Sequence, residues 1–530
     1  MFNIPTVTVA SQTLGSAAET ITLDYAAPDV SWTPRHLVIR WTARSNEAVS
    51  VERGVSLRLN GDTGANYYDQ RIDGAVSAVG SGAATGVTSI TNIGVDTGNN
   101  SAAYGWSSGE FILPDALSTR SHKSVIGFSG AIEQRVRIGT ARWANTAAIT
   151  SISLSQDGSG AFLAGSIVEL CVVDESYNIN EQILGSAGVL TVSSIAADIG
   201  DLVQIGNLKS TQAAISDEYK IKFNTDATAT NYNSQYIRGI GSAVAGLSAS
   251  KSDFGVVTGT HADVPTSAFG AYVGQVTNFS DGSNDRIFTG LSGTIYNAWS
   301  NYAQVKITTI RWNNTAAITT VQLENTYAAN WSTGSMLSTY AVPKNLIERQ
   351  ELSGTASSVT FSSIPQTYDH LELSIYVRGD SSGQPEAGFK NEFNGDTTVA
   401  NYKRQLIIAS GTTVAAGQVD SNQPVDFPTT TATANVFGSI AYSIQNYTKT
   451  DRHKHYMVTA GDAGENELRL TSNRWANTAA ISAIVFTPSA GNFITGSVFT
   501  LRGINAPAAT GTSDVAKLNG IEPSDIAEVN

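Results

Sequence analysis

The amino-acid sequence predicts an all-β protein: three tandem antiparallel β-sandwich domains of jelly-roll-like form, followed by a short C-terminal tail. Two observations carry this prediction. One motif occurs three times at intervals of a whole domain, and short stretches of alternating apolar and polar residues, bounded by turn residues, fill much of the chain. Only 15% of the residues are charged while Gly, Ser, Thr, Ala and Asn abound, which favours strands and tight turns over helices.

The first repeated motif reads Arg-Trp-x-Asn-Thr-Ala-Ala-Ile. Its three tryptophans are Trp143, Trp312 and Trp475. They are 169 and then 163 residues apart (312 − 143 and 475 − 312). Periods of 20–50 residues indicate solenoids or propellers, whereas a period near 165 is that of a complete domain.

A second motif recurs in phase with the first. It is a short turn sequence that begins at Asn60, Asn224 and Asn394 and precedes an Asn-Tyr pair. Asn-Gly in the first and third copies accepts positive φ and predicts a two-residue hairpin turn. The second copy has Thr225 in place of Gly, which predicts an altered turn. A Gly-Ser pair near the end of each copy is the third landmark.

These landmarks divide the chain into three repeats and a tail. The predicted ranges are repeat 1 at 1–173, repeat 2 at 181–341, repeat 3 at 346–504, and a linker with a duplicated tail peptide at 505–530. Each repeat is long enough to bury its own core.

Strand signals recur at equivalent places in the repeats. Residues 36–44 and 371–378 alternate, and alternation resumes after each tryptophan motif and each Gly-Ser pair. Two long stretches rich in Gly, Ser, Ala and Thr, residues 76–97 and 241–259, are predicted to be functional or mobile loops.

Charge and composition exclude several classes of function. The net charge is −13, and nucleic-acid binding needs a basic face, so no nucleic-acid partner is expected, and a membrane-surface role is disfavoured. The sequence contains no run of 18 apolar residues, so no membrane span is expected. The first residues lack the features of a signal peptide. Cys171, the lone cysteine, lies in an apolar run and is predicted to be a buried structural thiol.

No motif predicts catalysis, a cofactor or a metal. Gly-x-Ser-x-Gly occurs at 105–109 and 379–383, but neither serine lies between a clear strand and a helix, as a nucleophile elbow requires. A glycan-active enzyme would need clustered aromatic residues and two carboxylates, which the repeats are not expected to bring together.

Three further features have a functional and a structural interpretation. His453 and His455 could bind a metal from one strand face, but repeats 1 and 2 lack the pair, so a solvated strand face is favoured. The aspartates in the repeated turns are interpreted as turn residues. The arginines before the tryptophans could form a ligand platform, but a packing role is favoured because their motif persists while the loops differ.

The order of these motifs resembles the jelly-roll repeats of many structural proteins of tailed bacteriophages, among them head-decoration, head-fibre and tail-appendage proteins. Repeat 3 shows the order best, through Gly491–Ser497 to Leu501–Ile504. The resemblance covers nearly all of residues 1–504 and brings no catalytic residues with it. Repeat 2 departs most, with Trp331 near the place of Phe162 and Phe493.

The resemblance implies a non-enzymatic virion protein that decorates or cements the capsid surface, located on the virion surface after synthesis in the bacterial cytoplasm. Its partners would be capsid proteins or neighbouring subunits. The alternative is a tail-fibre or receptor-binding protein that contacts host glycans. Three domains on one chain could supply the three lobes that a homotrimer supplies elsewhere. The sequence is also compatible with a homo-oligomer.

The tail contains a small repeat of its own. Residues 514–519 recur as 525–530, and 516–521 also resembles the short repeated C-terminal peptide of such phage proteins. Paired apolar residues in the two copies make it a candidate docking peptide, through Val515, Leu518, Ile526 and Val529. A frayed tail is the other interpretation.

Overall fold

The computed structural model confirms the all-β fold class, with strands from one end of the described chain to the other. It describes residues 2–504 except 48–51, 100–103, 132–133, 159, 197–199, 213–215, 250–256, 259–264, 280–281, 296–302, 326–329, 343–346 and 463–466. The four residues of the candidate docking peptide lie outside these ranges. The described helical segments are single 3-10 turns: η1 (Glu175–Tyr177), η2 (Ala229–Asn231) and η4 (Val399–Asn401).

Each repeat has one eight-stranded antiparallel sheet, here called the inner sheet, and the strand order is the same in all three. In repeat 1 it is β1 (Thr6–Thr13), β12 (Ile167–Val173), β3 (Leu37–Ala43), β8 (Ser107–Leu113), β9 (Lys123–Ala131), β10 (Arg135–Trp143), β5 (Tyr67–Ala75) and β6 (Ala78–Val87). In repeat 2 it is β13 (Asn178–Ile183), β25 (Met336–Val342), β15 (Asp201–Leu208), β21 (Gly270–Thr277), β22 (Arg286–Thr294), β23 (Gln304–Trp312), β18 (Tyr232–Ile240) and β19 (Ala243–Ala249). In repeat 3 it is β26 (Glu348–Glu351), β37 (Val498–Ile504), β28 (His370–Val377), β33 (Gly438–Gln445), β34 (Lys454–Asp462), β35 (Glu467–Trp475), β30 (Tyr402–Ser410) and β31 (Thr413–Asp420).

A smaller outer sheet completes each sandwich. In repeat 1 it is β2 (Thr20–Asp24), β11 (Ser151–Gln156), β4 (Glu52–Leu59) and β7 (Ile90–Thr97). In repeat 3 it is β27 (Val359–Phe361), β36 (Ile484–Pro488), β29 (Glu386–Phe393) and β32 (Val425–Pro428). In repeat 2 it is divided into β14 (Leu190–Ser193), β24 (Thr320–Asn325) and β17 (Tyr219–Phe223), with the short pair β16 (Ser216–Asp217) and β20 (Val257–Thr258).

The two kinds of sheet have different burial patterns for a physical reason. Along β11 the side chains of Ile152 and Leu154 are buried while the alternating serines are half-buried, as expected for a strand with one wet face. Inner strands such as β3 and β9 are buried at every position. They are covered on one face by the outer sheet and on the other by the neighbouring repeats.

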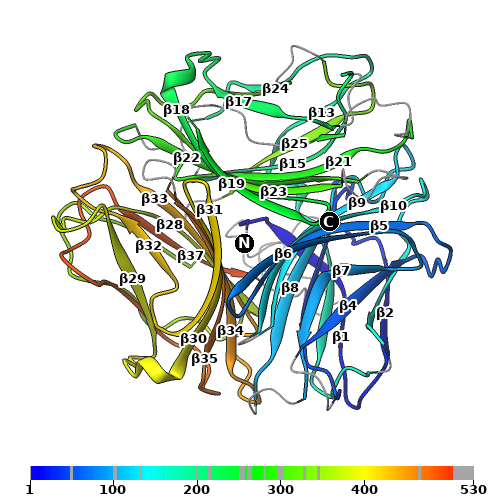
Figure 1. The fold of residues 1–530 in the computed structure, drawn as a ribbon, viewed down its shortest axis with the longest axis horizontal. Coiled ribbons are helices and arrows are strands. Elements are labelled where there is room, and N and C mark those ends of the chain that lie inside the picture. The colour runs from blue at the N-terminus through cyan, green and yellow to red at the C-terminus, as the bar shows by residue number, and fades with distance from the viewer. Residues whose placement is uncertain are drawn as a thin grey trace, which may run out of the picture.

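The three inner sheets surround a common axis, with the outer sheets at the periphery (Figure 1). Each sandwich has its own hydrophobic core between its two sheets. A further core contains residues of all three repeats, such as Val38, Val273 and Leu470, and lies where the inner sheets face one another. We call this the axial core, and the contacts between neighbouring repeats the 1/2, 2/3 and 3/1 seams.

The seams repeat one another closely. Gly130, Gly293 and Gly461 each follow the first residue of β9, β22 or β34 by seven positions. A Cβ on Gly293 would lie 2.3 Å from the Thr140 side chain of repeat 1, and one on Gly461 would lie 2.3 Å from Thr309 of repeat 2. A Cβ on Gly130 would lie 2.2 Å from Ser472 of repeat 3. These contacts run from each repeat to the next and close into a ring, a heterologous arrangement with pseudo-threefold symmetry.

The N-terminal arm adds an asymmetric element to the ring. Phe2 and Ile4 are buried in the axial core, and the backbone N–H of Asn3 donates to Gln275 Oε1 of repeat 2 at 2.9 Å. Asn3 Nδ2 and Arg502 Nη2 both approach the Asp201 carboxylate, at 3.4 and 2.9 Å. The N-terminal arm and the last strand of the described chain, β37, therefore meet at one aspartate.

Two predictions about connections are wrong. Asn60 and Gly61 have the expected positive φ of 53° and 64°, but β4 and β5 belong to different sheets, so the turn joins the outer to the inner sheet and makes no hairpin. Residues 76–97 form the strands β6 and β7, and much of 241–259 that is described forms β19 and β20. The strands β6 and β19, which are rich in Gly and Ala, contact each other near the axis (Figure 1).

Candidate functional site

The repeated motifs meet at one structural clamp in each repeat. Trp143 is buried, and its Nε1–H donates to Asp62 Oδ2 at 2.7 Å; the same bond joins Trp312 to Asp226 and Trp475 to Asp396. The side chain of Asn60 donates to the Ala148 carbonyl at 2.8 Å and accepts from the Thr150 N–H, and the equivalent bonds recur at Asn224 and Asn394. Each turn motif therefore holds its own tryptophan motif, and the clamp accounts for both repeated phrases.

The aspartate of the clamp is held as a carboxylate. Hydrogen bonds from the Trp143 ring, the Asn66 amide and the Gly64 backbone lower the pKa of Asp62. A carboxylate that accepts three donors from its own turn has a structural role, as the sequence interpretation of these aspartates proposed.

The prediction of an altered turn in repeat 2 is wrong. Asn224 and Thr225 have φ of 51° and 59°, and the Asp226 N–H donates to the Phe223 carbonyl at 2.9 Å, as the Asp62 N–H does to the Leu59 carbonyl. The bonds around Asn224 over-determine the turn, so a β-branched residue is held in a left-handed conformation that it rarely adopts.

The arginines beside the tryptophans contact groups of their own repeats. Arg311 Nε donates to Asp285 Oδ2 at 2.7 Å, and the Arg142 guanidinium lies 4.5 Å from the centre of the Tyr68 ring. Arg142, Arg311 and Arg474 are all buried. Their burial supports a packing role over a ligand platform.

The prediction that the histidine pair lies on a solvated strand face is wrong. His455 is buried in the 3/1 seam, where its Nδ1 contacts Ser108 Oγ of repeat 1 and its Nε2 contacts Ser472 Oγ at 2.8 Å. The His453 backbone N–H donates to the Tyr104 carbonyl of repeat 1 at 3.0 Å. The face of β34 that the sequence predicts to be solvated is covered by repeat 1.

The central serine of the first Gly-x-Ser-x-Gly segment is Ser107, whose hydroxyl donates to the Ala43 carbonyl at 2.7 Å. Its neighbour Ser108 contacts His455. Ser108 lies in the middle of the inner sheet, in β8, and is 1% exposed. The other histidine nitrogen meets a second serine, so this pair lacks the carboxylate that orients a catalytic histidine. Burial in a seam closes it to substrate.

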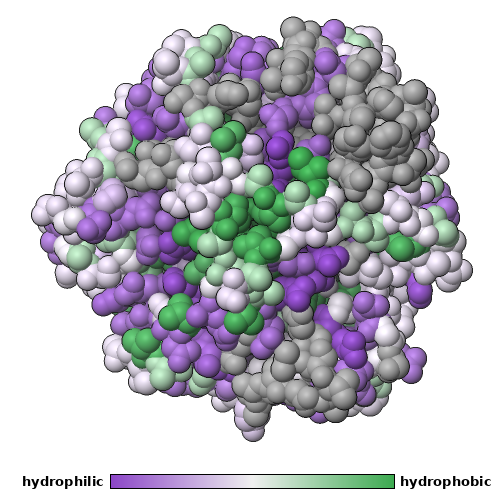
Figure 2. Space-filling view, in the orientation of Figure 1, coloured by the Kyte–Doolittle hydropathy of each residue, from purple (hydrophilic) through white to green (hydrophobic). Residues whose placement is uncertain are grey.

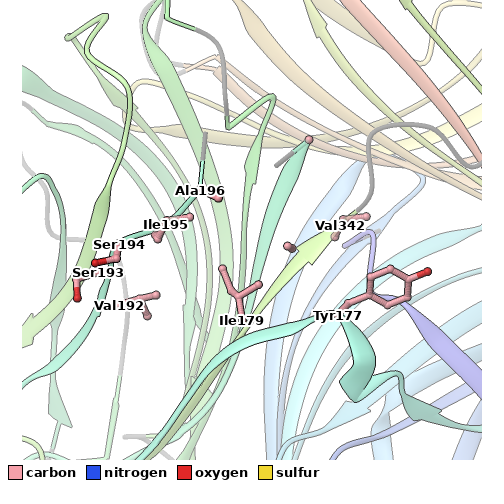
Figure 3. Close-up of a pocket in the computed structure, with 10 residues that line it drawn as sticks. Tyr177, Ile179, Val192, Ser193, Ser194, Ile195, Ala196 and Val342 are labelled. Carbon is pink, nitrogen blue, oxygen red and sulfur yellow. The ribbon is translucent and has the colours of Figure 1, made fainter. Parts of the chain in front are cut away.

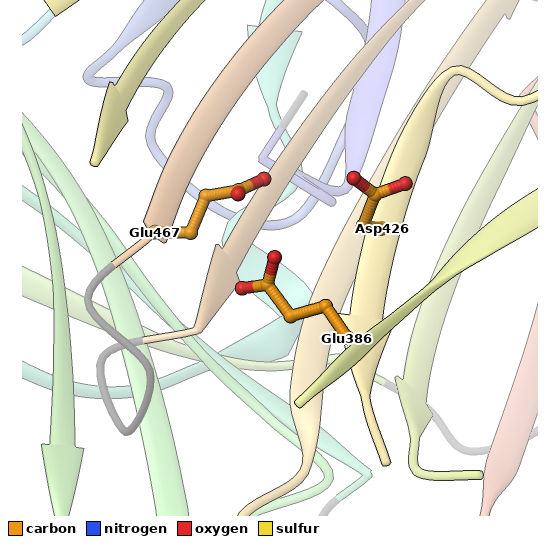
Figure 4. A group of neighbouring side chains, drawn as sticks. All are labelled: Glu386, Asp426 and Glu467. Carbon is orange, nitrogen blue, oxygen red and sulfur yellow. The ribbon is translucent and has the colours of Figure 1, made fainter. Parts of the chain in front are cut away.

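Repeat 3 brings together three carboxylates that sequence reasoning did not expect to meet. Glu386, Asp426 and Glu467 come from β29, β32 and β35, and one oxygen of each lies within 4.8 Å of the others (Figure 4). Arg469 pairs with Asp426 at 2.8 Å and with Glu467 at 2.6 Å. The residues lie on strands of both sheets and about 40 positions apart, so no local motif announces them.

Burial and the neighbouring Glu467 raise the pKa of Glu386 to about 9. At neutral pH Glu386 is therefore protonated and shares a hydrogen bond with Glu467, while Arg469 supplies the positive charge. Three carboxylate oxygens could contribute to a divalent cation site. The guanidinium and the shared proton offset two of the three negative charges of the cluster.

Two hollows lie away from these clusters. A groove of about 420 Å³ in repeat 2 is lined by β13, β14, the residues that follow β14, and β25, with apolar side chains that include Val192, Ile195 and Val342 (Figure 3). A polar groove of about 500 Å³ crosses the outer sheet of repeat 1. It is lined by Ser56, Arg58, Val87, Thr88, Ser89, Thr91, Ser155, Gln156, Asp157 and Gly158.

An apolar patch surrounds the pseudo-threefold axis on one face of the ring (Figure 2). The edge strands β6, β19 and β31 meet there, and Val79, Val244 and Val414, one from each repeat, pack against the axial core. The three strands together contain one charged residue, Asp420, in a chain of net charge −13. Contiguous apolar patches rimmed by polar residues are typical of interaction surfaces.

Comparisons with known proteins identify no relative. No protein-family model and no curated protein matches the chain. Solved structures give only weak similarities, to mouse laminin alpha1 domains LG4-5 (9% identity, TM-score 0.10, 62% of this chain and 94% of that one), the lipid-containing bacteriophage PM2 (10%, 0.09, 90% and 99%) and OccK7 of Pseudomonas aeruginosa (8%, 0.09, 86% and 100%). TM-scores this low carry no argument. Among the described residues no helix is long and apolar enough to cross a membrane.

Proposed function

We propose that this chain is a non-enzymatic structural protein of a bacteriophage particle and that it decorates or cements the capsid surface. The closed ring of three equivalent repeats on one chain supports this most directly. Such a ring presents three equivalent strands around one axis, so a single chain can engage three equivalent positions of a symmetric shell. The buried, hydrogen-bonded state of the repeated motifs supports a scaffold role for them.

The test is direct binding to particles assembled without this protein, followed by an electron-microscopy map of the loaded particles. Density for the ring on the head shell is the expected result. Density confined to the tail would contradict capsid decoration.

The tail peptide is proposed to strengthen this attachment. A chain truncated after Ile504 keeps every described strand and is expected to fold. Its binding to the same particles should fall measurably, since Val515, Leu518, Ile526 and Val529 can gain order only by burial against another surface. Equal binding by the truncated chain would leave the three repeats as the attachment surface.

The polar groove of repeat 1 favours a second candidate function, contact with a host glycan. Hydroxyls, an amide, Asp157 and Arg58 line it, and the buried carbonyl oxygen of Gln156 has no hydrogen-bond partner there. Saccharides supply many donors and acceptors for such a surface. Saturation-transfer NMR with a panel of neutral oligosaccharides would test this, with Gln156→Ala expected to weaken any binding and the seam variant Ser439→Ala expected to leave it unchanged.

A further inference from the structure

Every described histidine lies at a seam. The residue type at the equivalent positions differs from one seam to another. His36, Asp201 and His370 each stand directly before the first leucine of β3, β15 or β28. His36 Nε2 contacts Ser338 Oγ of repeat 2 at 3.0 Å, and His370 Nε2 contacts Glu169 of repeat 1 at 2.5 Å.

At the 2/3 seam the equivalent residue is an aspartate paired with an arginine. Asp201 accepts from Arg502 Nη2 at 2.9 Å and from Ser374 Oγ at 2.6 Å, both in repeat 3. The same replacement occurs at a second position, since His122, Asp285 and His453 each precede the basic residue that begins β9, β22 or β34. Asp285 there accepts from Arg311.

At these two positions the seams on both sides of repeat 1 therefore carry imidazoles, where repeat 2 carries Asp201 and Asp285, each paired with an arginine. The seams of repeat 1 also contain the carboxylate–arginine pairs Arg35–Glu181 and Arg40–Glu372. We propose that acid opens the ring at the 1/2 and 3/1 seams, so that repeat 1 separates from a joined pair of repeats 2 and 3 while all three sandwiches stay folded. This inference concerns the ring itself and goes beyond the proposed attachment to a capsid.

The geometry resists protonation of these rings while the seams are closed. His36 Nδ1 accepts the Asp115 backbone N–H at 3.1 Å, so it has no room for a proton of its own. His122 Nδ1 lies 3.1 Å from Arg142 Nη1, a donor that cannot accept in return. Among the described residues, the two ring nitrogens of His455 have the hydroxyls of Ser108 and Ser472 as their hydrogen-bond partners, so no carboxylate is bonded to the ring to stabilise an imidazolium there.

The electrostatic surroundings act in the same direction. Burial, with Arg35 nearby, lowers the pKa of His36 to about 3, and burial alone lowers that of His455 to about 3. Burial also lowers the pKa of the other two rings to about 4. The cations that add to this effect are Arg142, Lys123 and Lys209 around His122, and Arg474, Lys454 and Arg44 around His453.

The sign follows from these directions. An exposed imidazole titrates near pH 6.5. Closed-ring stability from these four groups is complete above that pH and is lost as the pH falls toward 4, because the open ring binds protons that the closed ring excludes. Burial raises the pKa of Glu372, which faces Arg40 across the 3/1 seam, to about 7, so this group releases a proton on opening. His370 lowers the pKa of Glu169 in spite of burial, so that carboxylate acts in the opposite direction. Four imidazoles that take up protons against one carboxyl that releases one give a net uptake of protons on opening.

Small-angle X-ray scattering of the full chain at fixed ionic strength, from pH 7.5 to 4, tests the proposal, with far-UV circular dichroism of the same samples. The radius of gyration should rise reversibly between pH 6.5 and 4 while the β-sheet signal is unchanged. No rise in that range, or loss of the sheet signal in the same step, would overturn the proposal.

Two sets of variants identify the groups and the seams. The double variant His122→Asp with His453→Asp copies the arrangement of Asp285 and should move the opening midpoint down by about one pH unit, since two of the titrating rings are gone. If that double variant folds poorly, His455→Gln should reduce the pH steepness of opening by about one proton. An unchanged midpoint in the first variant, or unchanged steepness in the second, would contradict the assignment.

A disulfide across the 2/3 seam is the matched control for the seams. Ser439 Oγ and Thr277 Oγ1 are 2.7 Å apart, close enough for a pair of cysteines, and the native Cys171 is buried. Locking this seam with Ser439→Cys and Thr277→Cys should leave the acid midpoint unchanged, because this seam does not open in the range. A midpoint that shifts with the lock would show that all three seams open together and would overturn the selective opening of repeat 1.

Discussion

The core inside each sandwich and the axial core shared by the repeats are built from different side chains. The core of repeat 3 interlocks large rings, such as Phe389, Phe486 and Phe493, with Trp475. The axial core is mostly Val, Ile, Leu and Ala, and glycines let its sheets approach closely. Interlocked rings fix the packing within one sandwich. Small and β-branched residues form flatter faces on which the sheets of different repeats can pack.

The largest expected effect is on the core inside one sandwich. Trp475→Ala removes a buried ring that is 1% exposed and bonded to Asp396, and it should destabilise repeat 3 by about 3–5 kcal/mol. Denaturant unfolding followed by circular dichroism measures this. A loss below about 2 kcal/mol would mean that the ring is not packed as described, and Trp331→Phe, which copies Phe162 and Phe493, is the mild control in repeat 2.

A smaller effect is expected at the axial core. In Gly293→Ala the new Cβ would lie 2.3 Å from the short Thr140 side chain, so a sheet has to shift, at a cost of about 1–3 kcal/mol. The matched control is Gly354→Ala, where nothing lies within 4 Å of the added carbon. Equal stability of the two variants in thermal unfolding would contradict the close approach of the inner sheets.

The sequence predicted the sandwiches better than the seams, and the reason is physical. Outer strands such as β11 show their alternation because one face is wet. The seam contacts join residues far apart in the chain, such as Ser108 and His455, and a strand face whose polar side chains meet another repeat has the same sequence pattern as a solvated face. For that reason the sequence predicts a solvated face for His453 and His455. The three carboxylates around Glu386 come from separate strands, so no local motif predicts them.

Alkaline pH is expected to act on a sandwich, in contrast to acid at the seams. Burial beside Glu467 raises the pKa of Glu386 to about 9, well above its usual value. Its contribution to stability is complete below about pH 4.5 and is lost as the pH rises toward 9, because the folded state must release the shared proton. Thermal unfolding of Glu386→Gln from pH 5 to 9 should show a flatter profile than the parent chain. Parallel profiles would exclude the shared proton.

The smallest expected effect concerns the one turn that departs from the repeat. Thr225 has φ of 59°, where the equivalent Gly61 and Gly395 have 64° and 75°, and a β-branched residue is strained in this region. Thr225→Gly relieves the strain but increases the freedom of the unfolded chain and removes the Thr225 hydroxyl bond to the Asn224 carbonyl.

The net result for Thr225→Gly should be a stabilisation of about 0.5–1 kcal/mol, within the range of single-residue backbone effects. The reciprocal variant Gly395→Thr is the control, and it should destabilise repeat 3 by a similar amount in denaturant unfolding. If Thr225→Gly instead destabilised repeat 2, the hydroxyl bond would outweigh the strain. The clamp around Asn224 would then owe its geometry to threonine as well as to asparagine.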